Sequence, residues 1–157
     1  KKIFKVIKFR SMRVDAEKDG VARLASENDD RITPVGKIIR KLRIDELPQL
    51  FNILSGSMSV VGPRPALWNQ YDLIAEREKY GANDVRPGLT GWAQINGRDE
   101  LEIPVKARLD GEYVKKLGPV IDLRCFFGTF LSVLRADGVV EGGTGAMHRE
   151  DKEGSVY

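Results

Sequence analysis

Two adjacent carboxylates, Asp45 and Glu46, are the sharpest candidates for chemistry in this sequence. They stand just before Pro48, which would break the interior of a helix but is tolerated where a new helix begins. The sequence therefore predicts a helix that starts here, with Asp45 near its N-cap and Glu46 in its first turn. An ionised Asp in that position can attack phosphorus as a nucleophile, and the neighbouring Glu can hold Mg²⁺. A simple capping Asp with a first-turn Glu is the alternative interpretation.

A third candidate is Arg64, which stands between Pro63 and Pro65. Each proline fixes its own φ and favours an extended predecessor, so the arginine has little conformational freedom to lose. Its planar, permanently charged guanidinium suits a phosphate, although a solvated arginine on a rigid loop is the alternative. Three further cations are candidates, with a solvated surface position as the alternative for each: Lys8, Arg10 and Arg40.

Two more acidic residues, Asp110 and Asp122, could take part in the chemistry. Asp122 interrupts an otherwise apolar segment, and a charge there needs a partner if it is buried. A structural ion pair is the alternative for both. Trp92 and Gln94 could line a ligand site, with a half-buried strand as the alternative.

Composition limits what these residues can do. The 157-residue chain is 41% hydrophobic and 31% charged, which predicts one folded domain. A single cysteine, Cys125, excludes a disulfide framework and multi-cysteine metal sites, and a single histidine, His148, removes most His-based chemistry. A net charge of +3 and a pI near 9.0 favour anionic partners, which leaves phosphates, nucleic acid and an acidic lipid surface open.

The elements that must position these residues follow from hydrophobic periodicity and from proline and glycine. Apolar residues at i, i+3, i+4 and i+7 predict a basic amphipathic helix over 35–43 and a second helix over 47–54 that ends at Gly56. Two strands are predicted over 2–12 and 58–65, with a surface loop or short helix over 15–33 between them. The remaining predictions are a helix over 67–80, a turn-rich segment over 86–98 containing the strand GWAQING, a helix over 104–117 interrupted at Gly111, and an apolar helix over 120–134.

No run of about 18 apolar residues predicts a membrane-spanning helix, and no signal peptide opens the chain. The chain starts at Lys1, in the middle of a predicted strand. We therefore expect a piece of a longer protein, which has room for a membrane anchor ahead of Lys1.

Three segments together resemble the bacterial sugar transferase family, the monotopic polyprenyl-phosphate phosphoglycosyl transferases. They are KFRSM (8–12), RIDELPQLFNILSGSMSVVGPRP (43–65) and RPGLTGWAQINGR (86–98), and the resemblance covers residues 3–135. It implies transfer of a phosphosugar from a UDP-sugar to a polyprenyl (undecaprenyl) phosphate, with release of UMP, through a covalent aspartyl-phosphosugar intermediate. Such a reaction is the first membrane step of bacterial glycoconjugate or exopolysaccharide synthesis.

The resemblance also implies roles for individual residues. Asp45 matches the nucleophile of the family, and Glu46 matches the carboxylate associated with Mg²⁺. The positions expected to bind phosphate and substrate match Lys8, Arg40, Arg64, Asp110 and Asp122.

We therefore expect a single helix-rich α+β domain with a few short strands over 1–136, followed by a polar, Gly-rich tail over 137–157. The implied location is the cytoplasmic face of the bacterial inner membrane, with the helices over 35–43 and 120–134 lying on anionic lipid. The re-entrant membrane helix that precedes the first strand in the family is missing from this sequence. No nucleic acid partner is expected. The rival hypothesis is a non-catalytic basic module that binds nucleic acid or anionic lipid. The sugar and the oligomeric state stay open.

Overall fold

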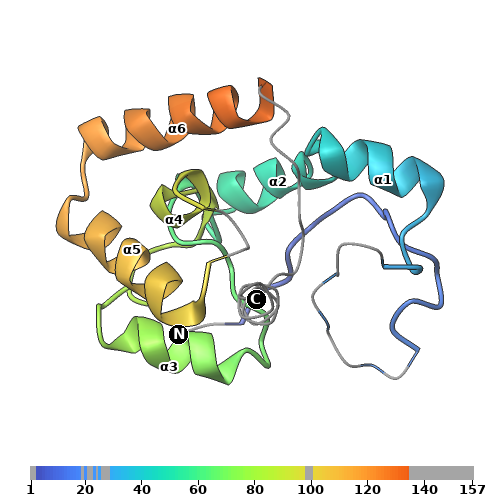
Figure 1. The fold of residues 1–157 in the computed structure, drawn as a ribbon, viewed down its shortest axis with the longest axis horizontal. Coiled ribbons are helices and arrows are strands. Elements are labelled where there is room, and N and C mark those ends of the chain that lie inside the picture. Colours follow the sequence, from blue (N-terminus) through green and yellow to red (C-terminus); the bar gives the residue numbers. More distant parts are fainter. Residues whose placement is uncertain are drawn as a thin grey trace, which may run out of the picture.

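Helices form where the sequence places apolar residues at helical spacing, with proline or glycine near the ends. The computed structural model describes residues 3–18, 20, 23, 25, 29–97 and 101–134, so the tail predicted over 137–157 lies outside the described residues. The elements are α1 (Pro34–Lys41), the 3₁₀ turn η1 (Ile44–Glu46), α2 (Gln49–Leu54), β1 (Ser59–Val61), α3 (Tyr71–Glu78), β2 (Gly88–Thr90), α4 (Trp92–Ile95), α5 (Ile103–Lys115) and α6 (Pro119–Leu134). The predicted helix-rich α+β class is confirmed (Figure 1).

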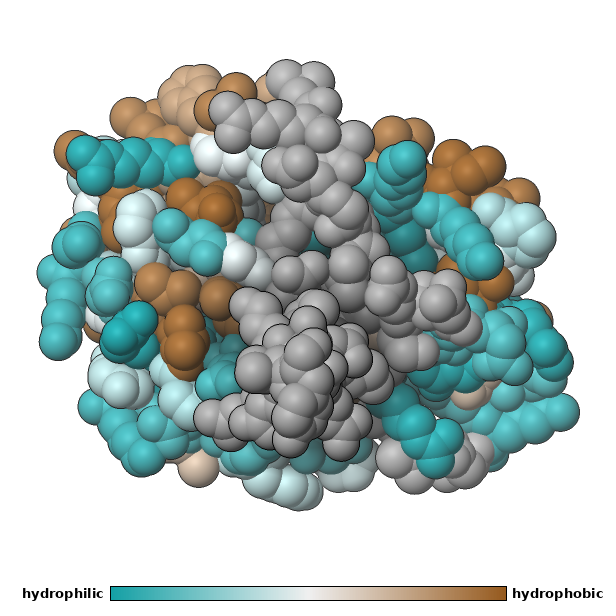
Figure 2. Space-filling view, viewed as in Figure 1, coloured by the Kyte–Doolittle hydropathy of each residue, from teal (hydrophilic) through white to brown (hydrophobic). Residues whose placement is uncertain are grey.

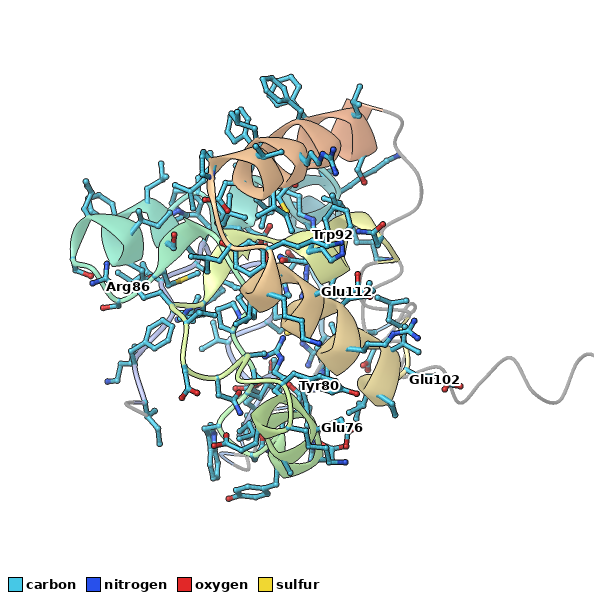
Figure 3. The ribbon with its side chains drawn as sticks, turned by 90° about the vertical axis from the view of Figure 1, so that its left-hand side faces the viewer. Glu76, Tyr80, Arg86, Trp92, Glu102 and Glu112 are labelled. Carbon is cyan, nitrogen blue, oxygen red and sulfur yellow. The ribbon has the colours of Figure 1, made fainter. Side chains whose placement is uncertain are left out.

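A small core lies where α4, α5 and α6 meet β1. Its buried members are Val61, Tyr113, Ile121 and Cys125, and the side chains of Trp92 and Ile95 pack against them. The Trp92 Nε1–H donates to Glu112 Oε2 at 3.3 Å and so joins α4 to α5 (Figure 3). α3 packs along the opposite side of α5, so α5 is held between two helices (Figure 1).

Two predictions in this half of the chain are wrong. The GWAQING segment is not a strand, because Trp92 and Ile95 must both face the core and their i, i+3 spacing does so only in a helix. Gly111 does not interrupt α5, which runs through it unbroken. The missing side chain lets Tyr80 pack against the helix, since an added Cβ would lie 2.6 Å from the Tyr80 Cβ (Figure 3).

The strand predicted over 2–12 is also wrong. Its described part has a single isolated antiparallel bridge, between Met12 and Ile32, and near residues 5–7 buried Asn52 of α2 takes the place of a neighbouring strand. The Ile7 N–H donates to Asn52 Oδ1 at 3.0 Å, and Asn52 Nδ2 donates to the Lys5 carbonyl at 2.9 Å. A side chain thus fixes this segment where a ladder was expected, and it brings the following residues beside η1.

β1 and β2 form a two-stranded parallel sheet in which Ser59 lies opposite Gly88 and Val61 opposite Thr90. Glycine is needed where β1 ends, because an added Cβ at Gly62 would collide with the backbone of Gly88. The proline-flanked arginine follows directly after this close approach, so the sheet fixes the start of its loop.

Much apolar surface faces outward along one side of the molecule. Exposed large apolar residues on α6 are Val120, Leu123, Phe126, Phe127, Phe130 and Leu131, and those on and around α1 and α2 include Val35, Ile38, Leu42, Leu50, Phe51 and Leu54. In Figure 2 they gather along the upper rim, over α6 and α1, whereas hydrophilic residues cover most of the lower part. Within the described residues, none of the helices has the length and apolar character needed to cross a membrane.

Candidate active site

The two adjacent carboxylates lie in η1, between α1 and α2, and both side chains are buried. The prediction that Asp45 caps the following helix is wrong. Pro48 is itself the N-cap residue of α2, so Asp45 and Glu46 close a separate 3₁₀ turn ahead of it. The Phe9 N–H donates to the Asp45 carbonyl at 3.0 Å and ties this turn to the N-terminal segment. The Asp45 carboxylate therefore does not cap α2.

Glu46 is where three cations from different parts of the chain meet. The Arg64 guanidinium binds it with two nitrogens, Nη2 at 2.6 Å from Oε1 and Nη1 at 3.4 Å from Oε2. Lys8 Nζ lies 3.3 Å from Oε1, and Arg43 Nη1 lies 3.5 Å from the same oxygen. We call these four residues the Glu46 cluster. The structure thus brings together Glu46, Lys8 and Arg64, which are all predicted site residues.

The charge of the Glu46 cluster follows from its contacts. Burial disfavours the ionised carboxylate, but attraction to Arg64, Lys8 and Arg43 outweighs burial and lowers the pKa of Glu46 from 4.5 to about 2. At neutral pH one anion therefore stands among three cations, and the excess positive charge suits a phosphate.

This lowered pKa predicts an acid-dependent loss of stability. Because the folded pKa is below the unfolded one, the contribution is complete above about pH 4.5 and is lost as the pH falls toward 2. The shift corresponds to about 3 kcal/mol in the free energy of unfolding. Urea unfolding at several pH values should show wild type losing this much more than Glu46→Gln over that range. Parallel pH profiles for the two proteins would contradict the pKa.

An open cleft of about 630 Å³ lies beside the Glu46 cluster. Asp45 lines it, together with Lys8, Arg40 and Arg64, so the structure brings the predicted nucleophile and the three predicted phosphate-binding cations to one cavity. The other cations in its lining are Arg10, Arg13, Arg23, Arg77 and Lys106. Among the described lining residues, eight basic side chains face two acidic ones, Asp45 and Glu17, which favours a multiply charged anion as the ligand.

Arg43 belongs to the Glu46 cluster, although it was not predicted as a site residue. It follows the C-cap of α1 with φ 58°, the one non-glycine residue with positive φ in the described part of the chain. Glycine is common at this position, and another residue costs roughly 1–2 kcal/mol there. A glycine at this position could not make the Arg43–Glu46 contact. An arginine where a helix-ending glycine is expected was the signal in the sequence.

Asp110 does not line the cleft in the described structure; it lies behind the cleft in α5, buried against Arg77 of α3. Arg77 Nε lies 2.7 Å and Nη2 2.6 Å from Asp110 Oδ2. Burial raises the pKa of Asp110, and Arg77 and Lys106 act against this shift. Arg77 was not predicted as a site residue; it follows buried Leu73 by four residues and so falls on the buried side of α3.

Asp122 stands apart from the cleft in the first turn of α6. It accepts a hydrogen bond from the Tyr113 hydroxyl at 2.9 Å, which joins α6 to α5. Burial is the main cause of a raised Tyr113 pKa, and the Asp122 carboxylate adds to it. The described contact of Asp122 is therefore with the core and not with the cationic cleft.

A second, mainly apolar pocket of about 360 Å³ lies on the other side of η1. Phe126 and Phe130 of α6 line it, as do Leu47, Glu46 and Arg43. Gln94 also lines this pocket and donates to the Leu89 carbonyl at 3.1 Å, whereas Trp92 belongs to the core. Two members of the Glu46 cluster, Glu46 and Arg43, thus also line the apolar pocket.

The donor set for a metal ion is small. Mg²⁺ is bound through one or two carboxylates, waters and the phosphates of a substrate. Asp45 and Glu46 offer two adjacent carboxylates, and the described residues contain no group of three or more His, Cys, Asp or Glu that could hold an ion. These residues fit a Mg²⁺ that arrives with a diphosphate, and such an ion would share the Glu46 carboxylate with Arg64.

Several known proteins are similar to this chain in sequence. The family described as "Bacterial sugar transferase" matches residues 1–136. The chain is 42% identical over 138 residues to the "Uncharacterized sugar transferase EpsL" of Bacillus subtilis, covering 88% of this chain and 66% of that protein. It is 41% identical over 141 residues to the "UDP-N-acetylgalactosamine-undecaprenyl-phosphate N-acetylgalactosaminephosphotransferase" of Aeromonas hydrophila, covering 86% and 33%.

A further relative is the "UDP-glucose:undecaprenyl-phosphate glucose-1-phosphate transferase" of Escherichia coli K12. It is 41% identical over 141 residues, covering 82% of this chain and 29% of that protein. The chain therefore spans 66% of the first of these relatives and no more than 33% of the other two.

Proposed function

The chain belongs to the bacterial sugar transferase family, and from this premise we propose that it transfers a sugar phosphate from a UDP-sugar to undecaprenyl phosphate or a similar polyprenyl phosphate. Two relatives are named for transfer of this kind, one with UDP-N-acetylgalactosamine and one with UDP-glucose. The main observation in this chain that supports the proposal is that Asp45 lies in a cleft whose described lining includes eight cations. The products are UMP and a sugar linked to the lipid through a diphosphate.

The transfer runs in two halves. First, an oxygen of the ionised Asp45 carboxylate attacks the phosphorus that carries the sugar; an Asp–O–P bond forms, and the P–O bond to UMP breaks. UMP leaves with the electron pair of that bond. Second, a phosphate oxygen of the lipid attacks the same phosphorus, the aspartyl bond breaks, and Asp45 returns as a carboxylate. This sequence needs neither histidine nor cysteine.

The cations hold the diphosphate and stabilise the charge that develops on it. Lys8, Arg40 and Arg64 are the residues placed to do so, because they line the cleft with Asp45. Glu46 keeps Lys8 and Arg64 in position before substrate arrives. Asp45 and Glu46 would hold a Mg²⁺ that arrives with the substrate, and that ion would supply further charge neutralisation.

The lipid acceptor approaches from the opposite side of η1. The pocket lined by Phe126 and Phe130 is mainly apolar and also includes Arg43, so it suits an isoprenoid chain whose phosphate points toward the Glu46 cluster. The exposed apolar residues on the same side fit a protein that lies on a membrane surface. We place that surface at the cytoplasmic face of the bacterial inner membrane, where UDP-sugars are available.

Release of UMP tests the proposal. The intact protein is mixed with undecaprenyl phosphate in detergent, Mg²⁺ and one UDP-sugar at a time, and UMP is measured. We expect UMP with at least one of UDP-glucose, UDP-galactose and UDP-N-acetylgalactosamine, and its loss when EDTA is added. No UMP with any of them, together with salt-sensitive retention on DNA, would favour the non-catalytic basic module instead.

Binding to anionic vesicles tests the membrane surface. The four cations predicted to meet lipid, Lys37, Arg40, Lys41 and Arg43, are not equivalent in the structure, because Arg40 lines the cleft and Arg43 contacts Glu46. Only Lys37 and Lys41 of this set are exposed. At about 1 kcal/mol each, changing both to Gln should weaken binding roughly 30-fold at low salt.

The measurement is sedimentation with anionic and neutral vesicles at increasing salt. Lys115→Gln, an exposed lysine on α5, is the matched control and should bind as wild type does. Salt-independent binding, or an equal loss with Lys115→Gln, would contradict a lipid role for α1.

A further inference from the structure

A buried ion pair lies directly behind the loop that carries Arg64. Arg77 and Asp110 have side chains only 4% and 1% exposed, and their contacts of 2.6 and 2.7 Å join α3 to α5. A buried charge that loses its partner is strongly destabilising, so each of these two residues depends on the other for its buried position. Asp110 therefore fixes where the Arg77 guanidinium lies.

The Arg77 guanidinium makes one more contact, and it is with the loop of the active site. Its Nη1 donates to the main-chain carbonyl of Arg64 at 2.9 Å. Pro63 and Pro65 on either side of Arg64 have no N–H to donate, so the backbone of this loop is anchored through its carbonyls. The Pro63 carbonyl accepts from the Gly88 N–H at 2.9 Å, and buried Arg77 holds the next carbonyl, that of Arg64.

The other end of Arg64 is in the Glu46 cluster, where its guanidinium lies 2.6 Å from Glu46 Oε1. A continuous chain of contacts thus runs from Asp110 through Arg77 and the backbone of Arg64 to the Glu46 carboxylate. Because Arg64 must meet both Glu46 and a phosphate, a shift of about 1 Å in its backbone can cost on the order of 10²-fold in rate.

We propose that Arg77 is a positioning residue for the transfer reaction, held by Asp110 and acting through the Arg64 carbonyl. The inference rests on the proposed function. It assigns Asp110 an indirect role, in place of the contact with substrate expected from the sequence. A plain α3–α5 ion pair, which only stabilises the fold, is the competing account.

The guanidinium fork makes the role testable, because arginine donates in several directions at once and lysine does not. Arg77→Lys keeps a positive charge for Asp110 but cannot match both sets of contacts. We expect kcat for UMP release to fall about 10- to 100-fold, with a smaller change in KM for the UDP-sugar. Arg31→Lys is the matched control, since Arg31 forms a similar two-contact ion pair with buried Asp29.

A double-mutant cycle separates positioning from stability. If Arg77 acts by positioning the Arg64 guanidinium, Arg64→Lys already removes that guanidinium. The double variant should then be no slower than Arg64→Lys alone. If Arg77 only stabilises the fold, the two losses should multiply. Multiplying losses, or an Arg77→Lys variant as active as wild type, would overturn the proposal.

Binding of inorganic pyrophosphate gives a second cycle that does not depend on turnover. Calorimetry at neutral pH should show weaker binding with Arg77→Lys and no further weakening in the double variant, even if no UDP-sugar proves to be a substrate. If the proposed function is wrong but Arg77 does position Arg64, turnover will be absent and pyrophosphate binding will still show this coupling between the two substitutions. Should Arg77→Lys not fold, Asp110→Asn, which keeps the shape and an acceptor for Arg77, should give the same coupling with a smaller loss; additive effects there also overturn the proposal.

Discussion

Asp45→Asn should leave the protein folded and reduce sugar-phosphate transfer to background, a loss on the order of 10⁴–10⁶-fold, as expected when a catalytic nucleophile is removed. The amide keeps the size of the buried side chain but lacks the anionic oxygen that attacks phosphorus. The hydrogen bond from Phe9 goes to the main-chain carbonyl of residue 45, so η1 should keep its position. UMP release and thermal unfolding measure the two effects separately.

Asp84→Asn is the matched control for this experiment. Asp84 is exposed in the turn after α3, so the same change of charge there should leave the rate near that of wild type. An Asp45→Asn variant that still released UMP at a measurable fraction of the wild-type rate would exclude Asp45 as the nucleophile.

Glu46→Gln should lower the rate about 10²–10³-fold, the range found when one preorganised electrostatic contact is lost. The change removes the only carboxylate that Lys8, Arg43 and Arg64 share in the Glu46 cluster. These cations then lose the anion that lies among them, and Arg64 loses its 2.6 Å contact with Glu46. If Glu46 also binds the metal, the variant should need more Mg²⁺ for half-maximal rate, and excess Mg²⁺ should partly restore it.

A Mg²⁺ titration of the UMP-release rate measures both effects in one experiment. Glu78→Gln, an exposed glutamate at the end of α3, is the control and should behave as wild type. A Glu46→Gln variant with a normal rate and an unchanged Mg²⁺ requirement would contradict both roles. A slow variant whose rate excess Mg²⁺ does not restore would support the electrostatic role of Glu46 and contradict its role in binding the metal.

Helices were predicted well because their signal is local. The spacing of apolar residues in α2 and the glycine that follows it are visible in the sequence, and the structure places Gly56 at φ 77° just after the C-cap. The strand predicted over 2–12 failed for a non-local reason. Its partner is the side chain of Asn52, about 45 residues away, and alternation of apolar residues cannot reveal such a partner.

Part of the candidate site could be predicted because its residue types are unusual where they stand. Asp45 and Glu46 precede a proline, and Arg64 stands between two, so their chemistry was visible before their contacts were. Arg43 and Arg77 were missed because their roles come from geometry. Arg43 has a left-handed backbone conformation and contacts Glu46. Arg77 lies on α3 and donates to the main-chain carbonyl of Arg64.

The capping role predicted for Asp45 shows where local rules compete. Both a capping Asp and a proline are compatible with the start of a helix, and the structure gives that position to Pro48. The Asp45 carboxylate, which lines the cationic cleft, therefore does not cap α2.

We propose that Asp45 carries the phosphosugar between the two half-reactions. The intact protein is mixed with Mg²⁺ and a UDP-sugar that it turns over, without polyprenyl phosphate, and is then digested and analysed by mass spectrometry. We expect the mass of the phosphosugar on the peptide that contains Asp45, and its disappearance when undecaprenyl phosphate is added. An adduct on another residue, or turnover of that UDP-sugar with no adduct in wild type, would contradict the claim.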